Sequence, residues 1–167
     1  MEWIKNLKIA QKLNVLLILA SIISLAIGLT GYLFVQKGVN DMTSMYKDRT
    51  LPIQWLGEIL FLQEKNFSNL IMIIEYPSEQ KRYLEDMENN RKTNDKLFSL
   101  YKNALLTKEE QQNLEKLENT VVEFRAQRKK VIAEVNKHNK EGVSIELVKL
   151  KKTHEERINI LKEIIEL

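Results

Sequence analysis

The 21 residues Val15–Val35, VLLILASIISLAIGLTGYLFV, contain no charged side chain, whereas charged residues recur throughout the rest of the chain. An α-helix rises about 1.5 Å per residue, so this stretch covers the roughly 30 Å of bilayer hydrocarbon with its backbone hydrogen bonds satisfied internally. A cleaved signal peptide is the alternative, but its apolar region is usually about 7–15 residues long and ends at a small-residue cleavage site. The one comparable triplet, Ala26-Ile27-Gly28, lies inside the apolar run. We therefore predict a transmembrane helix over residues 13–35.

The residues that flank this span indicate its orientation. Lys5, Lys8 and Lys12 precede it, and basic residues favour the cytoplasmic side of a membrane. Trp3 and Tyr32 lie near opposite ends, where aromatic rings favour the headgroup region. The prediction is a protein of the cell membrane that spans it once in this chain, with residues 1–12 in the cytoplasm and residues 36–167 outside.

Composition excludes several classes of function. The net charge is only +3, and Lys and Arg alternate with Asp and Glu instead of clustering, so no nucleic-acid partner is indicated. The chain has no cysteine, which removes disulfides and thiolate chemistry and leaves packing alone to hold the exported part. With 5 Gly and 2 Pro in 167 residues, there are few places for tight turns, and long helices are expected.

Helix-breaking and helix-capping residues divide the exported part into four helical segments. The first ends at Tyr76-Pro77, since the residue before proline leaves the α region, and Gly38 and Pro52 are positions where it bends or breaks. The second runs over residues 78–105, and Thr107-Lys108-Glu109-Glu110 is a capping box that begins the third. A polar turn over residues 136–142 precedes a fourth helix with Ser144 as its N-cap.

Each segment carries an inward-facing stripe with 3-4 spacing, the period of a left-handed helical seam. The stripes are Ile53, Leu56, Leu60, Gln63, Phe67, Leu70 and Ile74; Tyr83, Met87, Asn90, Asn94, Leu97, Tyr101 and Ala104; Leu114, Leu117, Val121, Phe124, Arg128, Val131 and Val135; and Leu147, Leu150, His154, Ile158, Leu161 and Ile165. The predicted fold is all-α, an antiparallel up-down-up-down four-helix bundle over residues 36–167 that continues from the transmembrane helix. We expect the fourth helix to continue past Leu167 towards the bilayer.

Five polar residues interrupt these stripes: Gln63, Asn90, Asn94, Arg128 and His154. Counting from the turns near Pro77 and Lys140 places them in one layer on the order of 20 Å below the membrane-distal tip. Counting from the turn near Leu106 moves Arg128 by roughly 9 Å relative to Asn90. We predict a ligand-binding layer; the alternative is a buried polar layer that fixes the alignment of the helices, with Arg128 reaching solvent along its aliphatic stem.

Catalytic and metal-binding patterns are absent from the sequence. His138 and His154 are sixteen residues apart, and no Ser-His-Asp set, metal-ligand spacing or Gly-rich phosphate loop occurs. We therefore predict a protein that is not an enzyme and that needs no metal or other cofactor.

The order of elements resembles the N-terminal half of methyl-accepting chemotaxis proteins with a four-helix-bundle sensor domain. The resemblance rests on the basic start Trp3–Leu13, the single span, and the segment Met45–Ile53 that enters a long helix. It implies a homodimer that binds a small extracellular solute or a solute-binding protein near the membrane-distal part of the bundle. It also implies that the fourth helix relays the signal to a histidine kinase and its coupling protein, through a cytoplasmic part outside this chain.

Part of the family pattern does not carry over. Amino-acid sensors of this family hold the ligand carboxylate with arginines on the distal part of the first helix, and residues 63–74 contain no arginine. A carboxylate ligand would have to be held by Arg128 or Arg91, whose guanidinium groups suit bidentate contact. The same bundle also precedes histidine kinases and cyclic-dinucleotide enzymes, and a membrane-tethered helical scaffold without a small-molecule ligand is the rival function.

Overall fold

A computed structural model describes residues 8–104 and 106–167 of the chain, and every regular element in these ranges is helical. The chain divides into two compact units, Met1–Tyr46 and Lys47–Leu167. The expectations for Trp3 and Lys5, and for Leu105 as the last residue of the second segment, fall outside the described residues.

The first unit consists of one long helix, α1 (Ile9–Met45). None of its residues is buried, and it contains an 18-residue window with a mean hydropathy of 2.4. Two hydroxyl groups in the apolar stretch are satisfied within the helix, because Ser21 Oγ donates to the Leu17 carbonyl and Thr30 Oγ1 to the Ala26 carbonyl, both at 2.9 Å. By length and composition, α1 is a helix that could span a membrane.

A π-helical turn, Tyr46–Thr50, follows α1, and α2 (Leu51–Glu75) begins directly after it. Pro52 lies in the first turn of α2 and has no N–H to donate to the turn before it, so the backbone there widens without ending the helix. Gly38, the other expected bend, lies inside α1, where it causes no interruption. Pro52 therefore has a local effect, and Gly38 has none on the helix boundaries.

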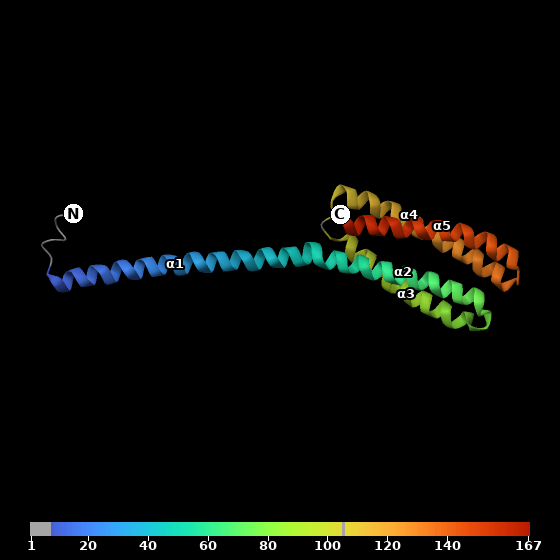
Figure 1. Ribbon diagram of the computed structural model, residues 1–167, viewed down its shortest axis with the longest axis horizontal. Coiled ribbons are helices and arrows are strands. Elements are labelled where there is room, and N and C mark those ends of the chain that lie inside the picture. The colour runs from blue at the N-terminus through green and yellow to red at the C-terminus, as the bar shows by residue number, and fades with distance from the viewer. Residues whose placement is uncertain (1–7, 105) are drawn as a thin grey trace. The chain divides into compact units, whose positions relative to one another are not determined.

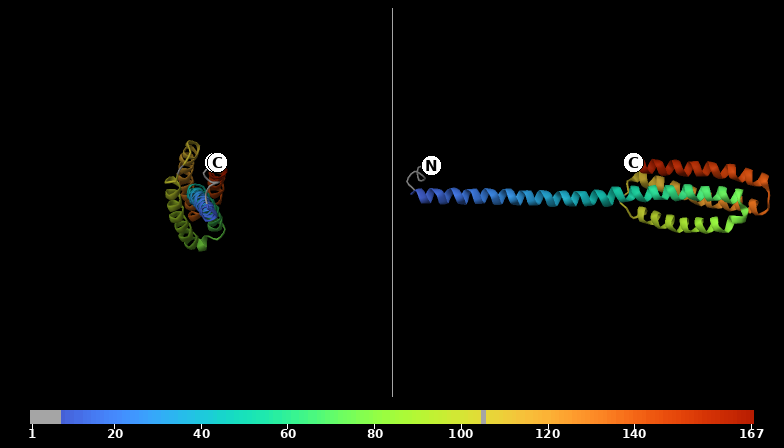
Figure 2. Two further views of the ribbon diagram at one scale, coloured as in Figure 1. Left: turned by 90° about the vertical axis from the view of Figure 1, so that its left-hand side faces the viewer. Right: turned by 60° about the horizontal axis from the view of Figure 1, so that its bottom comes forward.

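The second unit is a bundle of four antiparallel helices, which confirms the predicted fold class. It comprises α2, α3 (Gln80–Lys102), α4 (Lys108–Asn136) and α5 (Lys140–Glu166). The contacts are concentrated between α2 and α3 and between α4 and α5, so the bundle consists of two helical hairpins side by side (Figures 1 and 2). We call the end with the two hairpin turns the tip, and the end where α2 begins and α5 ends the base.

The turns follow from local capping chemistry. At the base, Thr107 Oγ1 accepts from the Glu110 N–H at 3.2 Å while Glu110 Oε2 accepts from the Thr107 N–H at 2.6 Å, which confirms the predicted capping box. At the tip, α2 ends before Pro77 as expected, and a 3₁₀ turn, Pro77–Glu79, leads into α3.

The start of α5 differs from the prediction that Ser144 is its N-cap. The N-cap is Asn139, whose Oδ1 accepts from the Gly142 N–H at 3.1 Å. His138 adopts the left-handed region with φ 55° and closes α4 in a Schellman motif, in which the Asn139 N–H donates to the Glu134 carbonyl. The turn is therefore tighter than the polar tract suggested, because the exposed His138 takes the position that glycine usually fills.

The apolar core is divided into two clusters. The base cluster comprises Leu56, Ile59, Leu62, Leu97, Tyr101, Leu114, Leu117, Ile160, Leu161 and Ile164. The tip cluster comprises Leu70, Ile73, Met87, Phe124, Val131, Val135 and Leu150. Together they contain most of the large side chains that the bundle buries completely, so the bundle has one hydrophobic core at each end.

The predicted stripes were most accurate on α3 and α4, where five of the seven expected positions are buried. These are Met87, Asn90, Asn94, Leu97 and Tyr101 on α3, and Leu114, Leu117, Phe124, Val131 and Val135 on α4. On α2 the buried stripe is Leu56, Ile59, Gln63, Asn66, Leu70 and Ile73. The expected Ile53 is 49% exposed, and the other expected positions without full burial, Leu60, Phe67 and Ile74, lie at the edge of the core. The prediction for α2 was thus rotated to one side, because apolar residues occupy two neighbouring faces of this helix.

Candidate functional site

A set of buried polar side chains separates the two apolar clusters. On every bundle helix these side chains lie between a residue of the base cluster and a residue of the tip cluster. We call this set the polar layer; it comprises Gln63, Asn66, Asn69, Asn90, Asn94, Thr120, Thr153, His154 and Arg157. Polar groups in such a position cost free energy unless they are paired, so their partners decide what the layer can do.

Four of the five predicted site residues belong to this layer: Gln63, Asn90, Asn94 and His154. The fifth, Arg128, lies after Phe124 on α4, on the tip side of the layer, and is half-buried. Arg128 therefore lies closer to the tip than the other four, which is the direction that counting residues from the Leu106 turn indicated. The ligand-binding role of all five remains a prediction.

Amide side chains of the layer are incompletely paired. Asn90 Nδ2 donates to Asn66 Oδ1 at 3.0 Å, which links α3 to α2. Within the described residues, neither amide atom of Gln63 has a hydrogen-bond partner, and Asn69 Nδ2 and Asn94 Oδ1 also lack one. Because these atoms make no hydrogen bond to another described residue, this part of the layer can accept and donate further hydrogen bonds.

On α5, His154 makes contacts with several other side chains. Its ring stacks on Phe67, with ring centroids 4.3 Å apart and an interplanar angle of 7°. Its Nε2 lies 3.3 Å from Glu64 Oε2, and its Nδ1 lies 2.9 Å from Arg157 Nη2. Burial, followed by the positive charge of Arg157, lowers the pKa of His154 below its ordinary value.

Arg157 was missed by the sequence analysis, although it is only 3% exposed. Its Cζ lies 3.8 Å from the centre of the Phe124 ring, a cation–π contact between α5 and α4. Burial lowers the pKa of Arg157, but a guanidinium group keeps its charge at any pH the protein meets. One signal could have revealed it: Leu150, His154, Arg157, Leu161 and Ile164 keep strict 4-3 spacing.

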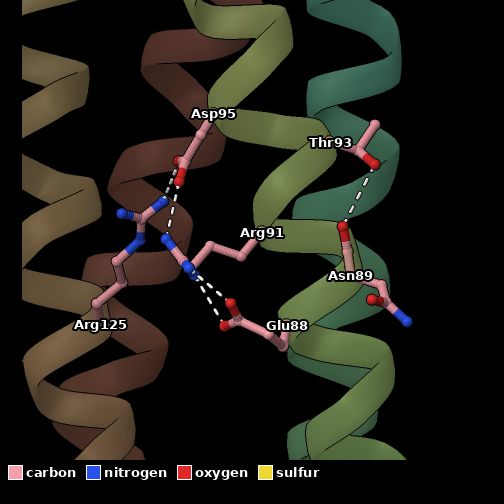
Figure 3. Close-up of polar contacts among 6 residues, drawn as sticks. All are labelled: Glu88, Asn89, Arg91, Thr93, Asp95 and Arg125. Atoms are coloured by element: carbon pink, nitrogen blue, oxygen red, sulfur yellow. Dashed lines mark hydrogen bonds and ion pairs between the residues drawn. The ribbon is translucent and has the colours of Figure 1, made fainter.

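Charged side chains form a network on the outer side of α3 and α4 (Figure 3). Arg91 donates to Glu88 at 2.6 Å and to Asp95 at 3.0 Å, and Arg125 reaches Asp95 from α4 at 2.6 Å. The hydrogen bond from Arg91 lowers the pKa of Glu88. Arg91, one of the two predicted carboxylate ligands, is therefore already occupied by acidic partners.

Arg128 lies next to this network and is less completely paired. Burial and the nearby charge of Arg125 lower its pKa, and its Nε atom is buried without a hydrogen-bond partner among the described residues. Of the two predicted carboxylate ligands, Arg128 is thus the one with a donor to spare. No group of three or more His, Cys, Asp or Glu side chains that could hold a metal ion occurs in the described ranges.

Comparison with protein families gives a match to the four-helix bundle sensory module for signal transduction over residues 6–167. The chain belongs to this family. The match extends over α1 and all four helices of the bundle, so this sensory module includes the long apolar helix as well as the polar layer. The family is one of signal-transduction modules and not of enzymes. Comparisons with curated proteins and with solved structures give no significant match.

Proposed function

We propose that this sensory module is the ligand-sensing region of a transmembrane chemoreceptor. Residues 1–12 lie in the cytoplasm, residues 13–35 cross the membrane, and residues 36–167 form the extracellular sensor domain of a homodimer. A small extracellular solute binds the bundle, and the displacement of α5 passes the signal to a cytoplasmic module coupled to a histidine kinase. The observation that carries this proposal is the incompletely paired polar layer between two separate apolar clusters.

The proposed binding groups are Gln63 and Asn94, with Arg128 as a cationic group at the edge of the layer. A buried donor or acceptor without a partner costs about 1–3 kcal/mol, and a ligand that pairs with it recovers this free energy. Asn90 and His154 already have partners, so their proposed role is to position the layer and not to contact the solute first.

The same arrangement favours transmission of a signal. Because the two apolar clusters are separate, the helices can repack at the polar layer without disrupting either core. A ligand shifts the population of two such packings only by its differential affinity for them. Small displacements of packed helices are a common form of this switching.

The test is thermal unfolding of the full chain in detergent micelles, followed by tryptophan fluorescence, with a panel of amino acids and organic acids. A solute at a hundred times its Kd stabilises the folded state by about 2.7 kcal/mol. The Gln63→Met and Asn94→Leu variants should lose the response, whereas Asn89→Leu, which changes an exposed amide on α3, should keep it. A solute that stabilises all of these proteins equally would place binding outside the polar layer.

A further inference from the structure

The hydrogen bonds of His154 determine which of its ring nitrogens carries the proton. A guanidinium group only donates, so Nδ1 of His154 must accept the 2.9 Å bond from Arg157 Nη2. The proton of the neutral ring is therefore on Nε2, which donates to Glu64 Oε2 at 3.3 Å. The result is a directed chain of hydrogen bonds, from Arg157 in the core through His154 to Glu64, a side chain that is 53% exposed.

Charged groups approach this chain from several helices. On α2 the group is Glu64, and on α5 Glu155 also favours the protonated ring. On α4, Arg125 and Arg128 add positive charge near Arg157. On α3, Asp95 forms an ion pair with Arg125 and so affects this region only through that arginine. His154 thus has a carboxylate on the side of Nε2 and a group of cations on the side of Nδ1.

Protonation of His154 changes both of its hydrogen bonds. The second proton must go on Nδ1, where it meets the N–H of Arg157, so two donors and two positive charges would face each other across 2.9 Å. Because Arg157 is 3% exposed and His154 7% exposed, water screens this repulsion poorly. The contact between Nε2 and Glu64 becomes an ion pair at the same time and is strengthened.

We propose that His154 is a proton-sensing site, in which uptake of a proton at Nδ1 displaces Arg157 from the core. The displacement breaks the cation–π contact of Arg157 with Phe124 and so weakens the attachment of α5 to α4. The ion pair with Glu64 strengthens the attachment of α5 to α2. The module therefore responds to pH on the side of the membrane where the bundle lies, by shifting α5 from its own hairpin partner towards the other hairpin.

The position of the site suits this function. His154 and Arg157 lie in the polar layer, between the two apolar clusters, so α5 can shift there while Leu150 and Leu161 remain in their own clusters. Burial and Arg157 lower the pKa of His154, which keeps the ring neutral at neutral pH and makes the response an acidic one. This response to protons is separate from the proposed binding of a solute, because the proton is the only ligand that the site requires.

The first test is NMR of the full chain in detergent micelles with nitrogen-15 in its histidines. The chain has two histidines, and a His154→Gln variant identifies the signals of His154. The expected result is an Nε2–H tautomer for His154 and a pKa below about 6.5, the ordinary value of histidine. An Nδ1–H tautomer, or a pKa at or above the ordinary value, would overturn the proposal. No solute is present, so the result does not depend on whether the module also binds one.

Variants then separate the two contacts. Glu64→Gln removes an exposed carboxylate that favours the imidazolium, so it should shift the pKa of His154 further down while the bundle stays folded. Arg157→Met removes the opposing cation and should shift this pKa up. Equal pKa values in both variants and the parent protein would contradict the hydrogen-bond chain.

The second test measures the movement. Since the chain has no cysteine, spin labels can be attached to single cysteines at exposed positions, as in a Lys152→Cys and Lys130→Cys pair across α5 and α4. The label distance should lengthen as His154 titrates, and His154→Gln should abolish the change while His138→Gln leaves it intact. A distance that stays constant through the titration, or that changes equally in His154→Gln, would refute the proposal.

Discussion

Replacement of Gln63 by methionine should stabilise the bundle. Gln63 is 1% exposed, and both atoms of its amide are buried without a partner in the part of the chain that the structure describes. Each unpaired group costs about 1–3 kcal/mol, and Met has a similar length and flexibility, so Gln63→Met should fit the space without overpacking. We expect a gain of about 2 kcal/mol in the free energy of unfolding.

The assay is thermal unfolding of residues 47–167, which form a compact unit with their own apolar clusters, followed by circular dichroism. For a domain of this size, 2 kcal/mol raises Tm by about 6–12 °C. The matched control is Asn90→Leu in the same layer, which breaks the 3.0 Å hydrogen bond to Asn66 and leaves Asn66 Oδ1 buried. It should cost about 1–3 kcal/mol. A lower Tm for Gln63→Met, or a shift of Tm in the same direction for both variants, would refute the predicted cost of the unpaired Gln63 amide.

Three further predictions concern the same bundle. Thr107→Ala removes the capping box of α4 and should cost about 1 kcal/mol in thermal unfolding, whereas Thr107→Ser should retain most of it. Burial raises the pKa of Tyr101, so folding favours the neutral form of its side chain. This contribution to stability is lost as the pH rises above about 10, the usual pKa of tyrosine. Tyr101→Phe should therefore make the loss of stability at alkaline pH less steep, and an unchanged pH profile would contradict this. Leu161→Ala removes a fully buried side chain from the base cluster and should cost about 2.7–5 kcal/mol by denaturant titration, whereas Ile145→Ala, at a position 51% exposed, should change stability by less than about 1 kcal/mol.

The sequence predicted the architecture because its strongest signals are local. The capping box at Thr107 and the break at Tyr76-Pro77 each depend on a few neighbouring residues, and both occur in the structure. The buried stripe of α3 was correct because apolar residues on this polar helix are few and fall on one face. On α2 they occupy two faces, so spacing alone could not decide between the stripe through Leu60 and the one through Ile59.

The partners of the polar layer were less predictable than its position. Gln63, Asn90, Asn94 and His154 could be found because they interrupt apolar stripes. Arg157 follows Glu155 and Glu156, and such a charged run usually lies on a solvated surface. Its burial depends on the ring of Phe124 and on the acceptor Nδ1 of His154, which come together only in the folded bundle.

The concentration of contacts within the two hairpins has a consequence for the order in which the chain folds. Helix α2 contacts α3 and helix α4 contacts α5, so most pairings join segments that are close in sequence and need only short loops to close. The α2–α3 hairpin can therefore form while α4 and α5 are still being synthesised. Its buried Asn66–Asn90 hydrogen bond would then already be made, and the second hairpin would dock onto a surface whose register is set.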